Sequence, residues 1–213
     1  MNIILFGPPG AGKGTHSNNI VNKFNYFPLS TGDLLRNEIK KNNEIGKKIF
    51  SLINKGEFVS DEIINSILVN IVSKPELKNR IIFDGYPRNL NQAEYLETLL
   101  KKNKQEIGFI IHLNVSREII EKRILGRLIC EKCNKILNEF TNQKELQNHT
   151  CGKEFLKKRQ DDNRETIIKR YDTYMQQTNP ILKFYSNKSN FFEIDASAEI
   201  DEITTKIEKI LRV

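Results

Sequence analysis

The fold of this chain is decided by residues 1–15, which read MNIILFGPPGAGKGT. The apolar run Ile3–Phe6 is typical of a buried strand, and it leads directly into the glycine-rich loop Gly7–Gly12. Helical spacing of apolar residues then begins at Lys13. A G-x-x-x-x-G-K sequence between a strand and a helix is the P-loop pattern, so these residues predict a phosphate-binding turn.

The residue types in this loop suit phosphate chemistry. Glycines allow the backbone N–H groups to point at phosphate oxygens, and the N-terminus of the following helix adds partial positive charge. Lys13 is predicted to reach the β- and γ-phosphates, and Thr15 is the candidate hydroxyl for magnesium, although Gly14 separates it from the lysine. The alternative is a glycine-rich turn without a ligand. The predicted nucleotide-binding residues of the loop are Gly10, Ala11, Gly12, Lys13, Gly14 and Thr15.

The rest of the chain repeats the alternation of strand and helix. Short apolar runs predict further strands, buried on both faces, at Phe27–Leu29, Ile81–Phe83, Ile107–Leu113 and Phe191–Ile194. Apolar residues at three- and four-residue spacing predict helices at Lys13–Phe24, Asn89–Leu100, Ser116–Leu125 and Ile200–Leu211. A further long helix is expected over Asp161–Tyr185, bent or interrupted at Pro180. The pattern predicts an α/β fold with a doubly wound parallel five-stranded sheet and helices on both of its faces.

Two segments depart from this alternation. Ser30–Val59 inserts two short helices, and Gly126–Asp162 is polar, weakly periodic and carries all three cysteines. We therefore expect a core built from residues 1–29, 60–125 and 163–213, with small insertions at 30–59 and 126–162.

Composition narrows the class of protein. With 213 residues, the chain is long enough for one main domain plus insertions. Lys and Arg exceed Asp and Glu by 34 to 27, but without a long basic run, so nucleic acid and small phosphorylated ligands both fit the charge. The apolar runs are far shorter than the ~20 residues that span a bilayer, and the N-terminus lacks a leader pattern. We expect a cytoplasmic protein without a membrane partner.

Two motifs at strand ends suggest a second ligand. Residues 31–36, TGDLLR, follow the second predicted strand, and residues 84–88, DGYPR, follow the third. Open α/β sheets bind ligands at the carboxyl ends of their strands. The two motifs therefore place Arg36 and Arg88 beside the P-loop, where they can hold a second phosphorylated molecule.

These motifs together resemble the adenylate kinase family over nearly the whole chain. The matching blocks, in order, are Gly7–Thr15, Ser30–Arg36, Gly56–Val59, Phe83–Arg88 with Gln92, Arg123–Arg127, and Arg159 with Asp161–Arg170. The resemblance implies a P-loop core, a helical domain for the nucleoside monophosphate at 30–59 and a mobile lid at 126–162. It also implies the reaction ATP + AMP ⇌ 2 ADP, with Mg²⁺ bound to ATP, in a monomer that takes ATP, AMP and ADP and no nucleic acid.

The resemblance assigns roles by position. The catalytic residues that it implies are Lys13, Arg88, Arg123, Arg159 and Arg170. ATP would also contact the loop Gly10–Thr15 and Arg127, and an adenine contact at Ala198 would rest on its backbone carbonyl. AMP would lie against Thr31, Arg36, Glu57, Phe58, Val59, Gly85, Tyr86, Pro87, Arg88, Gln92, Arg159 and Arg170, with the Gln92 amide reading adenine. Asp84 and Asp33 would orient magnesium-bound water. Asp161 and Asp162 would act at the lid hinge or clamp arginines.

Simpler interpretations exist for several of these residues. An arginine taken singly is more often a surface ion-pair former than a catalytic group. Thr31 also suits a helix N-cap, and Asp33 suits the first turn of a helix. The chain departs from the family at Leu128, where relatives often carry a second arginine.

The cysteines indicate a metal site. Cys130 and Cys133 form a C-x-x-C pair, which in a reducing compartment suggests metal ligands or a redox pair before a disulfide, and the count of three cysteines favours a metal. Lids of the family that carry zinc usually repeat this pair, and here only Cys151 follows. By position in such lids, we expect Cys130, Cys133, His149 and Cys151 to hold a structural Zn²⁺, with Glu154 as the alternative to His149. A lid of free thiols packed by Ile136, Leu137, Phe140 and Phe155 is the competing interpretation.

Two other functions remain open from the sequence. The first is a different nucleoside monophosphate kinase that accepts UMP, CMP or dTMP, or that uses GTP as donor. The second is a nucleic-acid-binding zinc module attached to an ATPase. The lid contains no cluster of basic and aromatic residues, which speaks against the second function.

Overall fold

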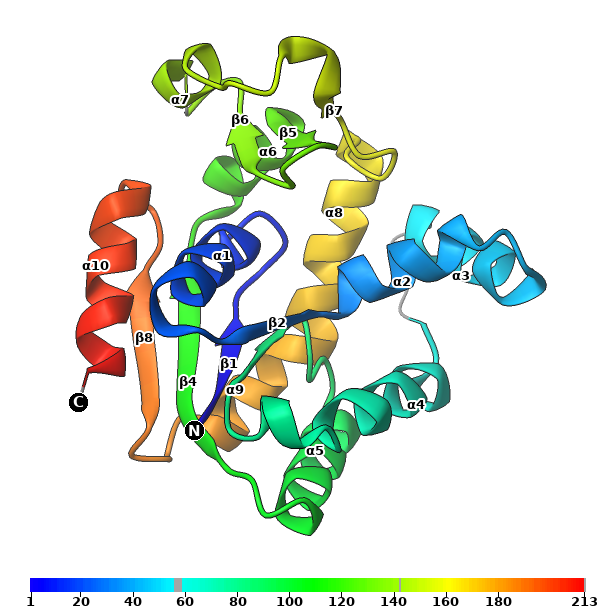
Figure 1. The fold of residues 1–213 in the computed structure, drawn as a ribbon, viewed down its shortest axis with the longest axis vertical. Helices are drawn as coiled ribbons and strands as arrows, with labels where there is room; N and C mark the ends of the chain where they lie inside the picture. The colour runs from blue at the N-terminus through cyan, green and yellow to red at the C-terminus, as the bar shows by residue number, and fades with distance from the viewer. Residues whose placement is uncertain (56–58, 142, 213) are drawn as a thin grey trace.

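The computed structural model describes residues 1–55, 59–141 and 143–212. Its main sheet has five parallel strands in the order β2-β3-β1-β4-β8. The strands are β1 (Asn2–Phe6), β2 (Phe27–Ser30), β3 (Ile81–Asp84), β4 (Ile107–Asn114) and β8 (Phe191–Asp195). All five predicted strands are confirmed within one or two residues at each end. The order places β1 in the centre, so the loop that follows it opens at the middle of the carboxyl edge (Figure 1).

Helices cover both faces of this sheet, as predicted. Ile3 and Leu5 of β1 point into one core with Ile20, Ile203 and Ile207 of the helices α1 and α10. The intervening residues Ile4 and Phe6 point into the opposite core. There they meet side chains of α4, α5 and α9, among them Leu68, Leu96 and Ile181. The alternation along one strand thus separates two apolar layers, which holds the doubly wound arrangement together.

The covering helices agree closely with the sequence pattern. They are α1 (Lys13–Phe24), α5 (Leu90–Lys102), α6 (Arg117–Leu125) and α10 (Ile200–Leu211). The helix α4 (Asp61–Val72) was not predicted. Ile, Leu and Val occupy most of its turns, so the apolar residues do not form the single stripe that reveals a half-buried helix.

The expectation that every strand is buried on both faces is wrong at the edges of the sheet. Phe27 of β2 is 37% exposed, and β8 keeps only Ile194 buried. An edge strand has a neighbour on one side only, and the covering helices reach over it incompletely. The three inner strands match the expectation in their central residues.

The predicted long helix near the C-terminus is divided into three parts. α8 (Arg164–Thr173) begins three residues later than expected, and Asn163 caps it by accepting from the backbone N–H of Thr166. A π-helical turn (Tyr174–Thr178) follows, and α9 (Asn179–Tyr185) completes the segment. Pro180 has no backbone N–H to donate, so the regular α-helical hydrogen bonds cannot continue through it. The π-helical turn lies directly before this interruption.

Both irregular segments leave the sheet as expected. The first contains α2 (Thr31–Lys40) and α3 (Glu44–Asn54), which project to one side in Figure 1. The second holds a small antiparallel sheet in the order β6-β5-β7, at the top of Figure 1. Its elements are β5 (Arg127–Cys130), β6 (Ile136–Asn138), α7 (Gln143–Gln147), a 3₁₀ turn (Lys153–Phe155) and β7 (Leu156–Lys157).

Within the residues described, no helix combines the length and the apolar character needed to cross a membrane.

Candidate active site

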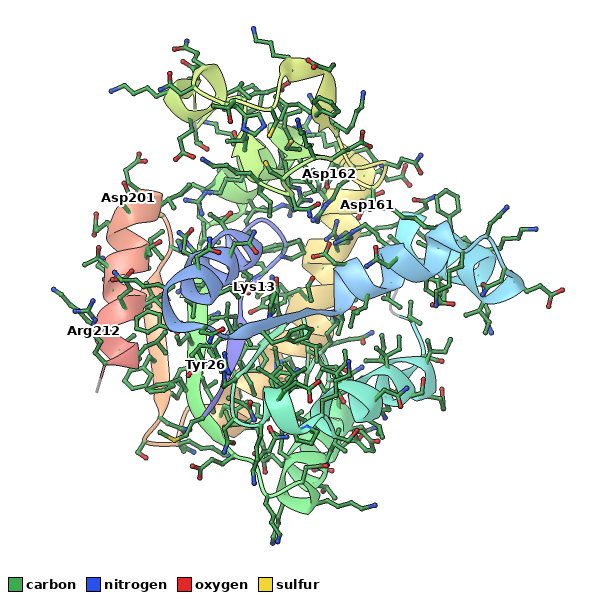
Figure 2. The ribbon with its side chains drawn as sticks, in the orientation of Figure 1. Lys13, Tyr26, Asp161, Asp162, Asp201 and Arg212 are labelled. Atoms are coloured by element: carbon green, nitrogen blue, oxygen red, sulfur yellow. The ribbon has the colours of Figure 1, made fainter. Side chains whose placement is uncertain are left out.

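The loop after β1 is built to present its backbone. Gly10 and Gly12 have φ angles of 82° and 94°, in the left-handed region that suits glycine. Lys13 turns back over the loop, and its Nζ donates to the carbonyl oxygens of Gly7 and Pro8 at 2.8 and 3.2 Å. Lys13 lies near the centre of the molecule in Figure 2. Its ammonium group is thereby held at the carboxyl edge of the main sheet.

A cavity of about 460 Å³ opens in front of this loop. It extends from the P-loop across α2 and α6 to the lid sheet and α8. The predicted site residues on its wall are Gly10, Gly12, Lys13, Gly14, Thr15, Arg36, Val59, Gly85, Tyr86, Pro87, Arg88, Arg123, Arg127, Arg159, Arg170 and Ala198. Asp33 and Asp84 also line it. The structure therefore brings together residues that lie as far apart in sequence as Gly10 and Ala198.

Three of the predicted nucleotide-site residues that the structure describes lie elsewhere. Ala11 is fully buried behind the loop. Thr31 and Gln92 line a much smaller neighbouring pocket of about 10 Å³, which also includes Val59, Gly85 and Arg88. Glu57 and Phe58 lie outside the described residues.

The small pocket has an ordered hydrogen-bond network. Gln92 is only 2% exposed; its Oε1 accepts from the backbone N–H of Arg88 at 2.7 Å, and its Nε2 donates to Asp61. The Thr31 hydroxyl donates to the carbonyl of Gly85 at 2.9 Å. The N-cap of α2 is Ser30, whose hydroxyl accepts from Asp33, so the interpretation of Thr31 as the N-cap is wrong. Asp33 does lie in the first turn, as expected.

Positive charge is crowded around the large cavity. Burial, partly offset by Asp84 and reinforced by Arg88, lowers the pKa of Lys13 to about 8. Burial and the charge of Arg170 lower the pKa of Arg88 to about 10, and burial with Arg127 lowers that of Arg159 to about 9. A guanidinium keeps its proton at neutral pH even so. These shifts identify like charges held close together with little water, an arrangement that a polyanion stabilises.

Carboxylates hold several of these cations in place. Asp161 accepts from Arg170 at 2.9 Å, and Asp162 accepts from Arg127 at 2.8 Å through its Nε. Asp161 and Asp162 lie where the lid joins α8 (Figure 2). Asp33 accepts from Arg36 at 2.6 Å. The clamping role expected of Asp161 and Asp162 matches these ion pairs.

Asp84 differs from those carboxylates because it is a half-buried acid at the end of β3 with no cation bonded to it directly among the ion pairs of the described residues. Burial raises its pKa, while Lys13 opposes the shift. A cation placed beside Asp84 would remove part of this cost. The residue therefore has the chemistry of a magnesium-site carboxylate.

Arg123 is fixed by the backbone of the β8–α10 connection. Its Nη1 donates to the carbonyl of Ala196 at 2.7 Å, and its Nη2 lies 3.4 Å from that of Ala198. Asn138 of the lid donates to the carbonyl of Arg123 at 2.7 Å. The small sheet β6-β5-β7 and the arginine in the last turn of α6 are thus directly connected.

Several residues of the cavity wall were not predicted from the sequence, and three of them are polar or aromatic side chains close to the P-loop and Arg88. His16, Tyr174 and Thr178 all line the large cavity. The Thr178 hydroxyl donates to the carbonyl of Arg88 at 2.9 Å, from the π-helical turn. No motif identifies these positions, and only the helical spacing of Tyr174 and Thr178 indicates that they face the core.

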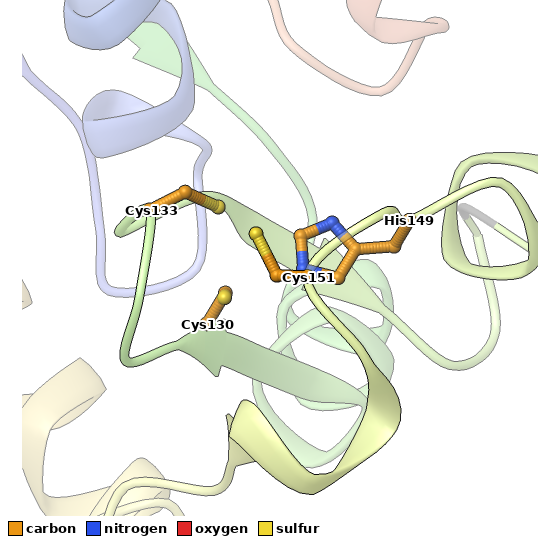
Figure 3. A group of neighbouring side chains, drawn as sticks. All are labelled: Cys130, Cys133, His149 and Cys151. Atoms are coloured by element: carbon orange, nitrogen blue, oxygen red, sulfur yellow. The ribbon is translucent and has the colours of Figure 1, made fainter.

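The irregular segment 126–162 contains a cluster of four candidate metal ligands. The ligand atoms of Cys130, Cys133, His149 and Cys151 all lie within 4.8 Å of one another. Figure 3 shows the four side chains pointing toward a common centre. Ligands of a tetrahedral zinc ion at ~2.3 Å lie roughly 3.8 Å apart, so the cluster needs only a small contraction. Glu154, the alternative fourth ligand, is not part of it.

Two further features of the cluster fit a metal. The Nε2 atom of His149 is buried without a hydrogen-bond partner among the residues that the structure describes. Although burial opposes ionisation, hydrogen bonds from the backbone of Cys133 and from His149 lower the pKa of Cys130 to about 6. An unpaired imidazole nitrogen beside a thiol that ionises readily is the donor chemistry that zinc uses.

The doubly wound sheet, the loop over β1 and the cation-rich cavity define the class of protein. It is a P-loop kinase that acts on nucleotides, with room for more than one phosphorylated ligand.

Comparison with known proteins gives the family. Residues 5–190 match the family model described as adenylate kinase. The chain is 59% identical over 213 residues to an adenylate kinase of Pelagibacter ubique, with both chains fully covered. It is 38% identical to that of Thermosipho melanesiensis and 39% identical to that of Rickettsia africae, again over the full length of both chains. The chain belongs to the adenylate kinase family, and it is therefore a phosphotransferase that binds nucleotides.

Proposed function

We propose that this chain catalyses ATP + AMP ⇌ 2 ADP by positioning the two nucleotides and by neutralising their charge under a closing lid. The observation that carries the proposal is the set of cations on one cavity wall. They are Lys13, Arg36, Arg88, Arg123, Arg127, Arg159 and Arg170. A cavity with this much buried positive charge is suited to two polyphosphates that would otherwise repel each other.

The reaction does not require a proton acceptor from the protein. The attacking atom is a phosphate oxygen of AMP, which is already largely ionised at neutral pH because its second pKa is near ~6. The barrier lies in bringing two anions together and in the charge of the transferred group. Fixed guanidinium groups lower this barrier because their orientation is established before the reaction begins.

The placement of the cations supports a division of labour. Lys13 and Arg123 flank the P-loop side and serve the ATP phosphates, with Arg127 added from the lid edge. Arg88, Arg159 and Arg170 serve the AMP phosphate or the transferred phosphoryl. Lys13 remains charged at neutral pH, since even its lowered pKa is about 8.

The AMP subsite is assigned to the small pocket and the nearby wall. Thr31, Arg36 and Val59 would hold AMP beside the backbone of Gly85–Arg88. The Gln92 amide already bonds to Arg88 and Asp61, yet an amide nitrogen carries two hydrogens, so one donor remains for adenine. Glu57 and Phe58 keep their place in the proposal from family resemblance alone.

Magnesium enters with ATP, as is general for adenylate kinases. Asp84 is the carboxylate that fits it best, because it lines the cavity at the end of β3 and interacts electrostatically with Lys13. Thr15 and Asp33 lie on the same cavity wall. The ion supplies positive charge that neutralises the phosphate oxygens of the donor.

We assign residues 126–162 as the lid, 30–59 as the AMP-binding domain and the remainder as the core. The lid touches the P-loop: a Cβ added to Gly14 would lie 3.3 Å from Cδ1 of Ile136. A lid in this position keeps water away from ATP until AMP is bound, which prevents wasteful hydrolysis.

We further propose that the lid holds a structural Zn²⁺ through Cys130, Cys133, His149 and Cys151. The support is the convergence of four donor atoms and the unpaired nitrogen of His149. The competing lid of free thiols needs apolar packing, but Phe140 is 57% exposed and only Leu137 of the four apolar residues is fully buried. The metal would stiffen the lid and take no part in the reaction.

A coupled assay across nucleotides tests the proposed reaction. With ATP as donor, AMP should give ADP formation at a much higher kcat/KM than UMP, CMP or dTMP, and GTP should be the poorer donor. Rapid turnover only with a pyrimidine monophosphate would instead identify the chain as another nucleoside monophosphate kinase.

We also propose that the enzyme acts as a monomer on free nucleotides and does not bind nucleic acid, because one chain supplies the whole cation set. Light scattering during turnover should give the mass of one chain. A gel shift with RNA or DNA that depends on salt and not on ATP would contradict the second part.

A further inference from the structure

His16 is an ionisable side chain of the cavity that the proposed mechanism does not use. It lies in the first turn of α1, directly behind the P-loop, and is 2% exposed. It nevertheless lines the large cavity, on the side where Arg123, Ser197 and Ala198 form the wall. The hydrogen-bond partners of its two ring nitrogens therefore decide whether the imidazole can bind a ligand in the cavity.

Thr204 can act as the hydrogen-bond donor to the ring of His16. Asn19 donates through Nδ2 to the hydroxyl oxygen of Thr204 at 3.0 Å. The same hydroxyl lies 3.1 Å from Nδ1 of His16, and it keeps its own hydrogen to donate there. When Nδ1 accepts this bond, the ring proton of a neutral imidazole is on Nε2.

The ring is neutral under ordinary conditions. Burial and the positive charge of Arg123 lower the pKa of His16 to about 4. At neutral pH the side chain therefore offers one N–H group, at Nε2, and no net charge.

The Nε2 edge of the ring lies against the P-loop. A Cβ added to Gly12 would approach both Cδ2 and Nε2 of His16 to 3.3 Å, so glycine at this position leaves space for the imidazole. Nε2 forms no hydrogen bond with any residue in the described part of the chain. A buried histidine that served packing alone would be expected to pair its N–H within the protein.

We infer that His16 is a binding residue of the donor nucleotide and that its Nε2–H donates to an oxygen of the ribose or the α-phosphate. His16 follows the loop that carries Lys13, assigned to the terminal phosphates, and it lies near Arg123, which donates to the carbonyls of Ala196 and Ala198 on the adenine side. The part of ATP between those two ends carries oxygen acceptors, and a neutral N–H donor suits them without adding another cation beside Arg123. The inference deepens the proposed function and rests on its assignment of the ATP side.

Equilibrium binding with three variants tests the inference. His16→Leu removes the donor at similar volume, and we expect the Kd for ATP to rise about 3- to 10-fold, the usual range for one neutral hydrogen bond. The Kd for AMP should stay within about twofold. His16→Gln keeps an N–H at similar reach and should restore most of the affinity. Thr204→Val removes the bond that fixes the ring, so a smaller loss for ATP is expected.

Imidazole ¹⁵N NMR of the wild-type protein tests the same point without relying on a variant to fold. We expect Nε2 of His16 to be protonated and Nδ1 to be unprotonated, and the Nε2 signal should shift on addition of ATP and not of AMP. A protonated Nδ1, or an Nε2 signal that ATP leaves unchanged, would overturn the inference.

The outcomes also separate the inference from the proposed function. Wild-type protein that fails to bind ATP would overturn both. Wild-type protein that binds ATP, together with a His16→Leu variant of equal affinity, would overturn only the role of His16. Comparing ATP with 2′-deoxy-ATP then locates the acceptor, since discrimination that disappears in His16→Leu places it on the ribose.

Discussion

The cation-rich cavity and the cysteine cluster of the lid both crowd similar groups together, yet they differ in how the protein tolerates the crowding. Around the cavity, buried cations lower one another's pKa, and Asp161 and Asp162 only partly compensate them. In the lid, thiols and one imidazole converge on a point where a single ion can satisfy all four. The first region is suited to ligands that come and go, and the second to a permanent one.

Because of this difference, substitutions in the two regions should affect catalysis and stability separately. Changes in the cavity should alter turnover with little loss of stability, because they remove unfavourable charge. Changes in the lid cluster should alter stability before turnover. Variants in the two regions therefore test whether activity and stability can change independently.

The largest effect is expected for Lys13→Met. Loss of the ammonium group should lower kcat/KM by about 10³-fold or more, because the charge acts on the developing transition state in a site with little water. The melting temperature should not fall, since a desolvated cation is replaced by an apolar side chain. Steady-state kinetics and calorimetry check both parts, with exposed Lys206→Met as the control. A large loss of stability that accompanies the loss of activity would remove the separation.

The next largest effect is expected for the lid metal. Chelation or Cys151→Ala should lower the melting temperature by at least about 5 °C, because binding energy for the metal contributes directly to folding. Activity at low temperature should remain within a fewfold of the starting value. Glu154→Gln is the matched control, and it should retain both the metal and the melting temperature. A melt that chelation leaves unchanged would contradict the zinc proposal.

A smaller effect is expected for Thr178→Val. This change is nearly isosteric and removes the hydroxyl that donates to the carbonyl of Arg88. We expect kcat/KM for AMP to fall about 3- to 10-fold, as for one hydrogen bond that positions a binding residue. Thr178→Ser should restore the activity. If Ser and Val behave alike, the methyl group and not the hydrogen bond matters.

The smallest effect concerns pH. Because burial lowers the pKa of Lys13 to about 8, the free enzyme loses this charge as the pH rises through that value. The profile of kcat/KM for ATP should fall above pH 8, whereas kcat should fall less, since bound phosphate favours the protonated lysine. The stability contribution has the opposite sign. In the unfolded state Lys13 keeps its proton up to the usual lysine pKa of 10.5, so the free energy of unfolding rises through Lys13 between about pH 8 and 10.5. A kcat/KM that is flat to pH 9.5 would contradict this assignment.

The sequence predicted the core of the fold because its signals are local. The loop Gly7–Thr15 has its strand before it and its helix after it, and alternating apolar runs define the other strands. It missed α4, whose apolar residues surround most of the helix, and it predicted too much burial for the edge strands β2 and β8. The lid strands have two to four residues, too few to show a period.

The site was predictable wherever charged residues stand in motifs. Arg36, Arg88, Arg123, Arg127, Arg159 and Arg170 were all expected at the cavity, and the structure places them on its wall. The role that we infer for His16 could not be reached in this way, because it depends on Thr204, 188 residues further along the chain. A tautomer is fixed by contacts across the fold, and those contacts leave no pattern in the sequence.

The central claim is that fixed positive charge, and not a protein base, drives phosphoryl transfer. The most direct test is the rate of a single turnover at saturating ATP and AMP for Arg88→Met, compared with Arg212→Met, an exposed arginine at the C-terminal end of α10 (Figure 2). We predict a fall of about 10²- to 10³-fold for Arg88→Met and no change for Arg212→Met. A rate for Arg88→Met within about twofold of the wild-type rate would contradict the account, because the loss of an electrostatic contribution of that size cannot leave the rate nearly unchanged.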